Sequence, residues 1–140
     1  TTGPLSGEML KNLNFANGTE VTADVDPSFI ITIPASVNFG TLTPGTGTVT
    51  QNFNVTASNV MLEAGSEISV KVTSDFKMTA AGDAELPYGL RNSTAYLTSG
   101  DEFASFTGNR TEYGYVYLSR ANIKNAGNYK GTMTFTISYE

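Results

Sequence analysis

The chain contains no cysteine, no histidine and no tryptophan among its 140 residues. Without cysteine no disulfide can cross-link the fold, so its stability must come from packing and strand pairing. The same absences exclude a Ser-His-Asp triad, a Cys-His pair and the usual zinc sites. Because nucleophiles and bases are so scarce, we predict a protein that is not an enzyme and that uses no metal or cofactor.

Charge is also scarce, and this absence limits the partners of the chain. Only 15% of the residues are charged, the net charge is -5, and the basic residues form no cluster. Binding to nucleic acid depends on basic side chains that neutralise phosphates, so a nucleic-acid partner is not expected. No apolar run approaches the roughly 20 residues that a membrane-spanning helix needs, and we predict no membrane span.

Threonine, asparagine, serine and glycine are abundant, and they accompany many short alternating apolar patterns. Threonine favours strands, whereas asparagine, glycine and serine favour turns. One predicted strand covers Tyr113 to Leu118. The region 91–112 before it is expected to be polar and irregular. Phe103 and Phe106 are predicted core anchors within that region. The other predicted strands cover residues 21–25, 29–33, 37–39, 48–57, 68–72 with 76–78, 86–90 and 129–140.

This series of strands predicts an all-β fold, an immunoglobulin-like Greek-key β-sandwich with an N-terminal extension. A closed barrel is the competing architecture. We place the extension at residues 1–18 and the sandwich domain at residues 19–140.

The last strand, residues 129–140, has the most regular pattern. Its apolar side chains alternate with threonine and serine, which is the period of a strand with one buried face. A strand this regular needs a partner on both sides, or it presents an edge to another chain. The apolar face consists of Tyr129, Met133, Phe135, Ile137 and Tyr139.

The first 18 residues offer such a partner, although their pattern allows two structures. Apolar residues and one glycine occupy odd positions, interrupted by Lys11, as in a strand: Leu5, Gly7, Met9, Leu13 and Phe15. Leu5, Met9, Leu10 and Leu13 would also share one face of a short helix capped by Ser6. The segment can therefore pack on its own domain or insert into a neighbouring subunit.

Three stretches of the sequence resemble parts of known protein families. Val21-Thr22-Ala23-Asp24-Val25-Asp26-Pro27 resembles the start of pilin domains of the colonisation-factor type. Phe39-Gly40-Thr41-Leu42-Thr43-Pro44-Gly45 resembles a stretch of fimbrial and spore-coat-like domains, and Ala126 to Thr136 resembles their closing strand. The resemblance implies an extracellular sandwich at the bacterial cell surface, with its signal peptide removed, that lacks one strand and receives it from a neighbour.

Carried onto this chain, the resemblance implies a donor segment and an acceptor groove. Subunits joined in this way polymerise head to tail with copies of themselves. The implied donor residues are Leu5, Gly7, Met9, Leu13 and Phe15, and the implied acceptor residues are Met133, Phe135, Ile137 and Tyr139.

A second functional hypothesis concerns three tyrosines, Tyr113, Tyr115 and Tyr117, which alternate along one strand. Their rings lie on one sheet face, where they could stack on sugar rings or form an ordinary cross-strand ladder. This pattern keeps open the alternative of a monomeric adhesion or carbohydrate-binding module of a larger protein, with a host glycan or protein as receptor.

The acidic residues are weaker candidates for a site. Calcium takes six to eight oxygen ligands. The acidic groupings that could contribute to a calcium site are Asp24 with Asp26, and Asp101 with Glu102. A glycosidase pair could be formed by Asp83 with Glu85 or by Asp101 with Glu102, but no motif supports either. Solvated charges are the better interpretation of all these residues.

Overall fold

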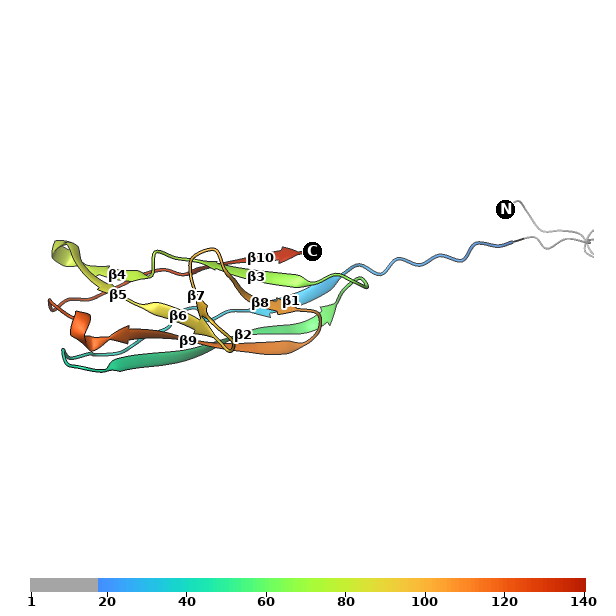
Figure 1. Cartoon of the computed structure of the whole chain (residues 1–140). Helices are drawn as coiled ribbons and strands as arrows, with labels where there is room; N and C mark the ends of the chain where they lie inside the picture. The colour runs from blue at the N-terminus through green and yellow to red at the C-terminus, as the bar shows by residue number, and fades with distance from the viewer. Residues whose placement is uncertain (1–17) are drawn as a thin grey trace, which may run out of the picture.

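Alternating side chains build ten strands in the part of the chain that the computed structural model describes, residues 18–140 (Figure 1). Two short 3-10 turns, η1 (Ala81–Asp83) and η2 (Arg120–Asn122), interrupt them. The strands are β1 (Ser28–Thr32), β2 (Thr48–Met61), β3 (Ile68–Thr73), β4 (Lys77–Ala80), β5 (Ala84–Pro87), β6 (Gly89–Asn92), β7 (Tyr96–Leu97), β8 (Glu102–Phe106), β9 (Arg110–Ser119) and β10 (Thr134–Tyr139).

The strands form two main antiparallel sheets and a small hairpin. The larger sheet has the order β1-β2-β9-β6-β7, the smaller has the order β10-β3-β8, and β4 pairs with β5. Strands β2 and β9 pair over ten positions, from Thr48 opposite Ser119 to Ala57 opposite Arg110. The predicted all-β sandwich is confirmed, and no closed barrel forms from residues 18–140 because the two sheets keep separate edges.

Aromatic side chains from both sheets meet in the core. Phe53 of β2 stacks on Phe103 of β8 with ring centroids 5.4 Å apart. Phe135 of β10 lies edge-on to both, with its centroid 6.2 Å from Phe53 and 5.6 Å from Phe103. The other buried members of this cluster are Val55, Ala57, Ile68, Val70, Val72, Leu90, Ala104, Phe106 and Val116.

Gly114 of β9 makes room for this aromatic contact. A Cβ atom at Gly114 would lie 2.8 Å from the ring of Phe103 and 2.9 Å from the carbonyl oxygen of Arg91. Real Cβ atoms do not approach so closely, and a packed interior cannot easily shift to accept extra atoms. Glycine at this position therefore allows β8 and β9 to close over the core.

The expectation of an irregular region over residues 91–112 is wrong, although Phe103 and Phe106 are fully buried as expected. The region contains β7, β8 and the start of β9. Its strand pattern is obscured by a register shift in the β3–β8 pairing between Val70 and Lys71. Phe103 and Ala104 are both buried as a result, so the two-residue alternation that marks a strand is lost there.

Two predicted strands near the start of the described chain are not formed. Residues 21–25 are fully exposed and pair with no strand among residues 18–140, since they run away from the sandwich as an extended segment (Figure 1). Val37 and Phe39 lie in an irregular connection between β1 and β2, where both side chains pack on the core. Alternation alone could not show that these residues lack a pairing partner.

Two further strands differ in extent from the prediction. The expected strand over residues 86–90 is divided at Tyr88 between β5 and β6, which belong to different sheets. The final strand covers only residues 134–139, and Lys130 forms a separate bridge with Thr79. Between them Gly131 passes so close to Lys77 that a Cβ atom would lie 2.7 Å from its carbonyl oxygen.

Candidate strand-accepting edge and aromatic face

The two sheets of the sandwich end side by side in strands that do not pair with each other. β1 is the outermost strand of the larger sheet, and β10 is the outermost strand of the smaller one. Their ends meet where the rings of Phe29 and Tyr139 lie 6.3 Å apart. Among residues 18–140 no ladder joins β1 to β10. We call this side of the sandwich the open edge.

The inward face of β10 is only partly covered at the open edge. Ile137 and Tyr139 stand opposite Val70 and Ile68 of β3 and therefore share a sheet face with them. Val70 and Ile68 are fully buried, whereas Ile137 remains 41% exposed and Tyr139 36% exposed. The apolar side chains of the edge strand thus face the interior, and no layer formed by residues 18–140 covers them.

The residues that the resemblance implies as an acceptor groove lie along this edge. Met133 and Phe135 pack against the core, and Ile137 and Tyr139 continue the same row toward the end of β10. Sequence reasoning missed the opposite wall, which consists of the half-buried Phe29, Ile31, Val37 and Phe39. The alternation of Phe29 and Ile31 was visible, but nothing in the sequence placed β1 across from β10.

Tyr139 closes one end of the open edge. Its hydroxyl accepts a hydrogen bond from the backbone N–H of Glu63 and lies 3.1 Å from a carboxylate oxygen of the same residue, to which it donates. The backbones of Glu67 and Glu140 exchange two hydrogen bonds of 2.8 Å nearby. These contacts tie the end of β10 to the β2–β3 connection, so the edge strand is fixed at that end.

The predicted donor residues Leu5, Gly7, Met9, Leu13 and Phe15 lie outside the described residues. The segment that follows them, residues 18–27, extends from the sandwich at the end where β10 finishes (Figure 1). Every residue in it is exposed. Residues 18–27 therefore lie outside the sandwich, and the chain enters the sandwich at the start of β1.

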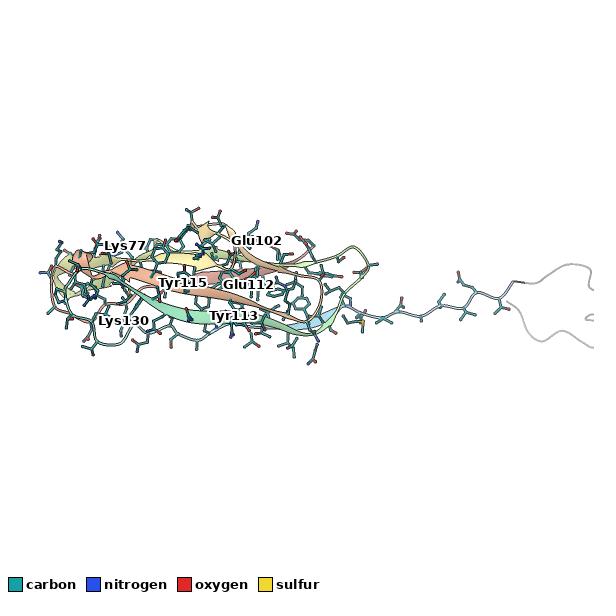
Figure 2. All side chains as sticks on the ribbon, turned by 60° about the horizontal axis from the view of Figure 1, so that its bottom comes forward. Lys77, Glu102, Glu112, Tyr113, Tyr115 and Lys130 are labelled. Carbon is teal, nitrogen blue, oxygen red and sulfur yellow. The ribbon has the colours of Figure 1, made fainter. Side chains whose placement is uncertain are left out.

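The predicted tyrosine row lies on the outer face of the larger sheet. Tyr113, Tyr115 and Tyr117 alternate along β9 with the buried Glu112, Gly114, Val116 and Leu118. Figure 2 shows Tyr113 and Tyr115 following one another along this strand. The rings of Tyr115 and Tyr117 are 6.1 Å apart. The structure thus brings the three tyrosines onto one exposed surface.

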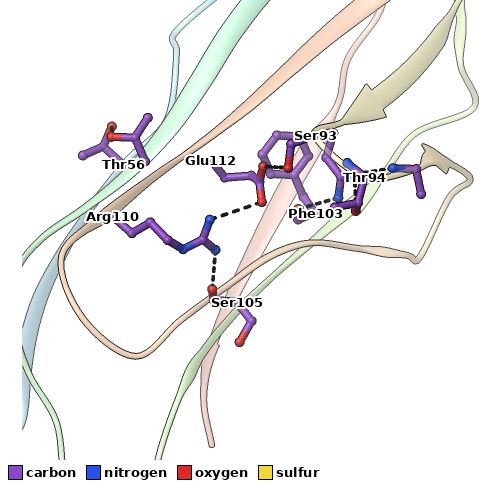
Figure 3. A network of polar contacts seen from close by, with 10 residues as sticks. Thr56, Ser93, Thr94, Phe103, Ser105, Arg110 and Glu112 are labelled. Carbon is purple, nitrogen blue, oxygen red and sulfur yellow. Dashed lines mark hydrogen bonds and ion pairs between the residues drawn. The ribbon is translucent and has the colours of Figure 1, made fainter.

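A buried polar network lies behind this face (Figure 3). Glu112 is buried and accepts hydrogen bonds from the hydroxyl of Ser93 and from Arg110, whose Nη1 lies 3.4 Å from its Oε1. Asn92 donates to the carbonyl oxygen of Phe103 over 2.9 Å and accepts from the backbone of Thr94. Each buried polar group has a partner, so the network fixes the β6–β7 turn against β8 and β9.

The acidic pairs that were candidates for calcium are either exposed to solvent or hydrogen-bonded to neighbouring side chains. Asp24 and Asp26 are exposed on the extended segment. Asp101 accepts hydrogen bonds from Thr98, and Glu102 accepts one of 2.7 Å from Ser69. Within residues 18–140 no three acidic side chains gather in a way that could hold a metal ion.

Two side chains away from the open edge, Tyr88 and Lys77, have a raised pKa. Burial raises the pKa of the Tyr88 hydroxyl, which lies 3.0 Å from the hydroxyl of Ser74. The hydrogen bond and charge of Glu85 raise the pKa of Lys77, whose amine lies 3.0 Å from the Glu85 carboxylate. Lys77 and Glu85 are exposed, so this pair adds little to stability. Neither group lies at the open edge.

Comparison with known proteins defines the fold. No family model matches the chain, and no curated protein matches it. The structure is similar to the P pilus rod subunit PapA, with a TM-score of 0.59, 14% sequence identity, and coverage of 80% of this chain and 99% of PapA. The chain therefore has a fold like that of a fimbrial subunit, which agrees with the resemblance seen in its sequence.

A second solved structure has a similar fold. It is a chain of the chaperone–tip adhesin complex of CFA/I fimbriae biogenesis, with a TM-score of 0.55, 18% identity, and coverage of 79% of this chain. The match spans 41% of that longer chain.

No helix in residues 18–140 is long and apolar enough to cross a membrane.

Proposed function

We propose that this chain is a non-enzymatic structural subunit of a bacterial surface fibre, and that its open edge receives a strand from a neighbouring copy. The subunits would then be linked head to tail outside the cell. The observation that carries the proposal is the uncovered inward face of β10, where Ile137 is 41% exposed opposite the fully buried Val70. A strand laid between β1 and β10 would cover that face and occupy both unpaired strand edges.

The N-terminal segment of a neighbour is the occupant that best fits this edge. Apart from Lys11, its odd-numbered residues from Leu5 to Phe15 would present one face of apolar residues and a glycine, which is what a strand needs when one side faces a core. The extended residues 18–27 lead away from the sandwich, so they provide a linker between two subunits. The rotation between linked copies determines whether they form an open fibre, and an open fibre is the general outcome of head-to-tail contacts.

The energy of such an exchange is adequate for a stable fibre. Leu5, Met9, Leu13 and Phe15 are four large apolar side chains. Burying each stabilises the complex by about 1.5–3 kcal/mol, and new backbone hydrogen bonds add direction. The sum is on the order of 10 kcal/mol before the entropy of ordering the segment is subtracted. The similarity to PapA supports the proposal, since that protein is a pilus rod subunit.

The variant Ile137→Glu is expected to block assembly without unfolding the subunit. A carboxylate at this position stays solvated in the free subunit, because the side chain is 41% exposed. An inserted strand would bury it without a partner, which is strongly unfavourable. Sedimentation velocity of purified full-length protein should show monomers for Ile137→Glu under conditions in which the parent chain assembles.

The variant Ile30→Glu is the matched control for this experiment. Ile30 is 50% exposed and lies on β1 opposite Ser58, next to the inward-facing Ile31. Its side chain therefore points away from the core. Assembly of Ile30→Glu should match that of the parent chain. If both variants assemble normally, the open edge is not where subunits join; if both fail equally, the effect of Ile137→Glu is not specific to the inward face.

A further inference from the structure

The outer face of the larger sheet carries a continuous cross-strand row of polar and aromatic side chains. Tyr115 of β9 stands opposite Asn52 of β2 on one side and opposite Arg91 of β6 on the other. Arg91 in turn stands opposite Tyr96 of β7. Directly paired residues point to the same side of a sheet, so this row of four crosses the strands β2, β9, β6 and β7 beside Tyr113 and Tyr117.

The aromatic rings in this row have fixed positions. Tyr117 lies over Gly89, where a Cβ atom would lie 2.3 Å from the ring, so glycine leaves the space that the ring fills. The ring of Tyr96 meets Tyr117 edge-on at 5.6 Å, and Tyr115 meets Tyr117 at 6.1 Å. Edge-on packing of this kind is favourable and directional. The face is thus an ordered platform, with Tyr113 64% exposed at its border.

Arg91 places a positive charge on this platform and forms no ion pair with an acidic residue among residues 18–140. Its guanidinium carbon lies 4.8 Å from the centre of the Tyr96 ring. The ion pairs among residues 18–140 are Lys77 with Glu85 and Arg110 with Glu112, and neither involves Arg91. A guanidinium held by an aromatic ring keeps its N–H groups available, and its planar fork matches a carboxylate. In a chain of net charge -5, this arrangement favours a small anionic group at one place.

A depression of about 580 Å³ lies beside Arg91. Its walls include the rings of Tyr113 and Tyr115, and its polar rim includes Asn52, Arg91 and Ser93. The volume is in the range of small-ligand sites. Two aromatic walls with an amide, a hydroxyl and a cation around them suit a ligand that has an apolar ring face, many hydroxyl groups and one carboxylate.

We propose that this face binds glycans that carry an acidic sugar, such as a sialic acid or a uronic acid. The sugar ring stacks on Tyr115 through its C–H bonds, which meet the negative face of the aromatic ring. Its carboxylate pairs with Arg91, and its hydroxyl groups exchange hydrogen bonds with Asn52. A further hydroxyl donates to the Ser93 oxygen, whose own proton is donated to Glu112. This binding site lies on the outer sheet face and does not depend on strand exchange at the open edge, so the two proposals can fail separately.

The test is a glycan array on the full-length chain, using matched pairs of glycans with and without the terminal acidic sugar. Affinities of the best pair are then measured by titration calorimetry for the parent chain and for Arg91→Gln, Arg91→Lys and Tyr115→Ala. We expect Arg91→Gln to weaken binding of the acidic glycan by about 10- to 100-fold, the effect of losing a charge-assisted contact. Arg91→Lys keeps the charge without the fork and should lie between the parent and Arg91→Gln.

Lys130→Gln is the matched control, since it removes a positive charge from an exposed side chain elsewhere on the sandwich, and it should bind like the parent chain. The proposal is overturned if no acidic glycan binds, if neutral and acidic members of a pair bind equally, or if Arg91→Gln and Tyr115→Ala bind like the parent. Loss of fibre assembly in Tyr115→Ala together with no glycan binding would also overturn it, and would identify the face as a contact between subunits.

Discussion

A chain that lacks residues 1–16 is expected to remain monomeric where the full-length chain forms fibres. The deletion removes every proposed donor residue and leaves all ten described strands intact, since β1 begins at Ser28. The sandwich should therefore keep its fold, with its stability changed by no more than about 0.5 kcal/mol, as for changes away from packed regions. Negative-stain microscopy measures the loss of fibres, and thermal unfolding measures the stability of the subunit.

A peptide of residues 1–17 provides the complement to this deletion. Added in excess to the shortened chain, it should raise the melting temperature, because a ligand that binds only the folded state stabilises it by about 2.7 kcal/mol at a concentration 100 times its Kd. A peptide with the same residues in scrambled order should have no effect. If the shortened chain forms fibres as well as the full chain does, the N-terminal segment is not the donor strand.

The second large effect is expected from Phe103→Ala, which should destabilise the subunit by about 3–5 kcal/mol. Phe103 is fully buried between Phe53 and Phe135 and so joins the two sheets. Its removal leaves a cavity that the surrounding strands cannot fill. The expected loss is a large part of the 5–15 kcal/mol that stabilises a typical domain, and urea unfolding followed by tyrosine fluorescence measures it.

Tyr113→Ala is the control for this measurement, because Tyr113 is also an aromatic residue but is 64% exposed. Its cost should stay within about 0.5 kcal/mol. Similar costs for the two variants would mean that the contact of Phe53, Phe103 and Phe135 does not hold the sheets together as described.

The strands that could be predicted are those in which regular alternation coincides with pairing to at least one neighbouring strand. β2, β3 and β9 have this property, and their buried residues Val55, Val70 and Val116 were visible as every second side chain. β8 was missed because a register shift buries two successive residues, Phe103 and Ala104. Residues 21–25 show the opposite case, in which regular alternation occurs without any pairing partner among the described residues.

The candidate sites were predictable to the same limited degree. Phe135, Ile137 and Tyr139 share one face because they lie on a single strand, and a single strand is readable in a sequence. Phe29 and Ile31 could not be assigned to the same edge, because only the sheet topology places β1 beside β10. Arg91 was missed beside the tyrosines for the same reason, since its contact with Tyr115 comes from the pairing of β6 with β9.

Disulfide trapping between copies tests the central claim most directly. The chain has no cysteine, so any disulfide must come from two introduced residues. Ile137→Cys is combined in turn with Met9→Cys, Leu13→Cys or Phe15→Cys, and with Leu10→Cys and Asn14→Cys as controls from even positions. After oxidation, denaturing gels without reductant are compared with reduced gels.

Strand exchange predicts a ladder of covalent oligomers for at least one odd position, lost on reduction, with none at the even positions. A disulfide needs Cα atoms within about 7 Å of each other, so a ladder places the donor strand beside β10 of another copy. A disulfide that forms within single chains would contradict exchange between copies and show that the segment packs on its own domain. Uncrosslinked monomers at every position would contradict the open edge as the acceptor.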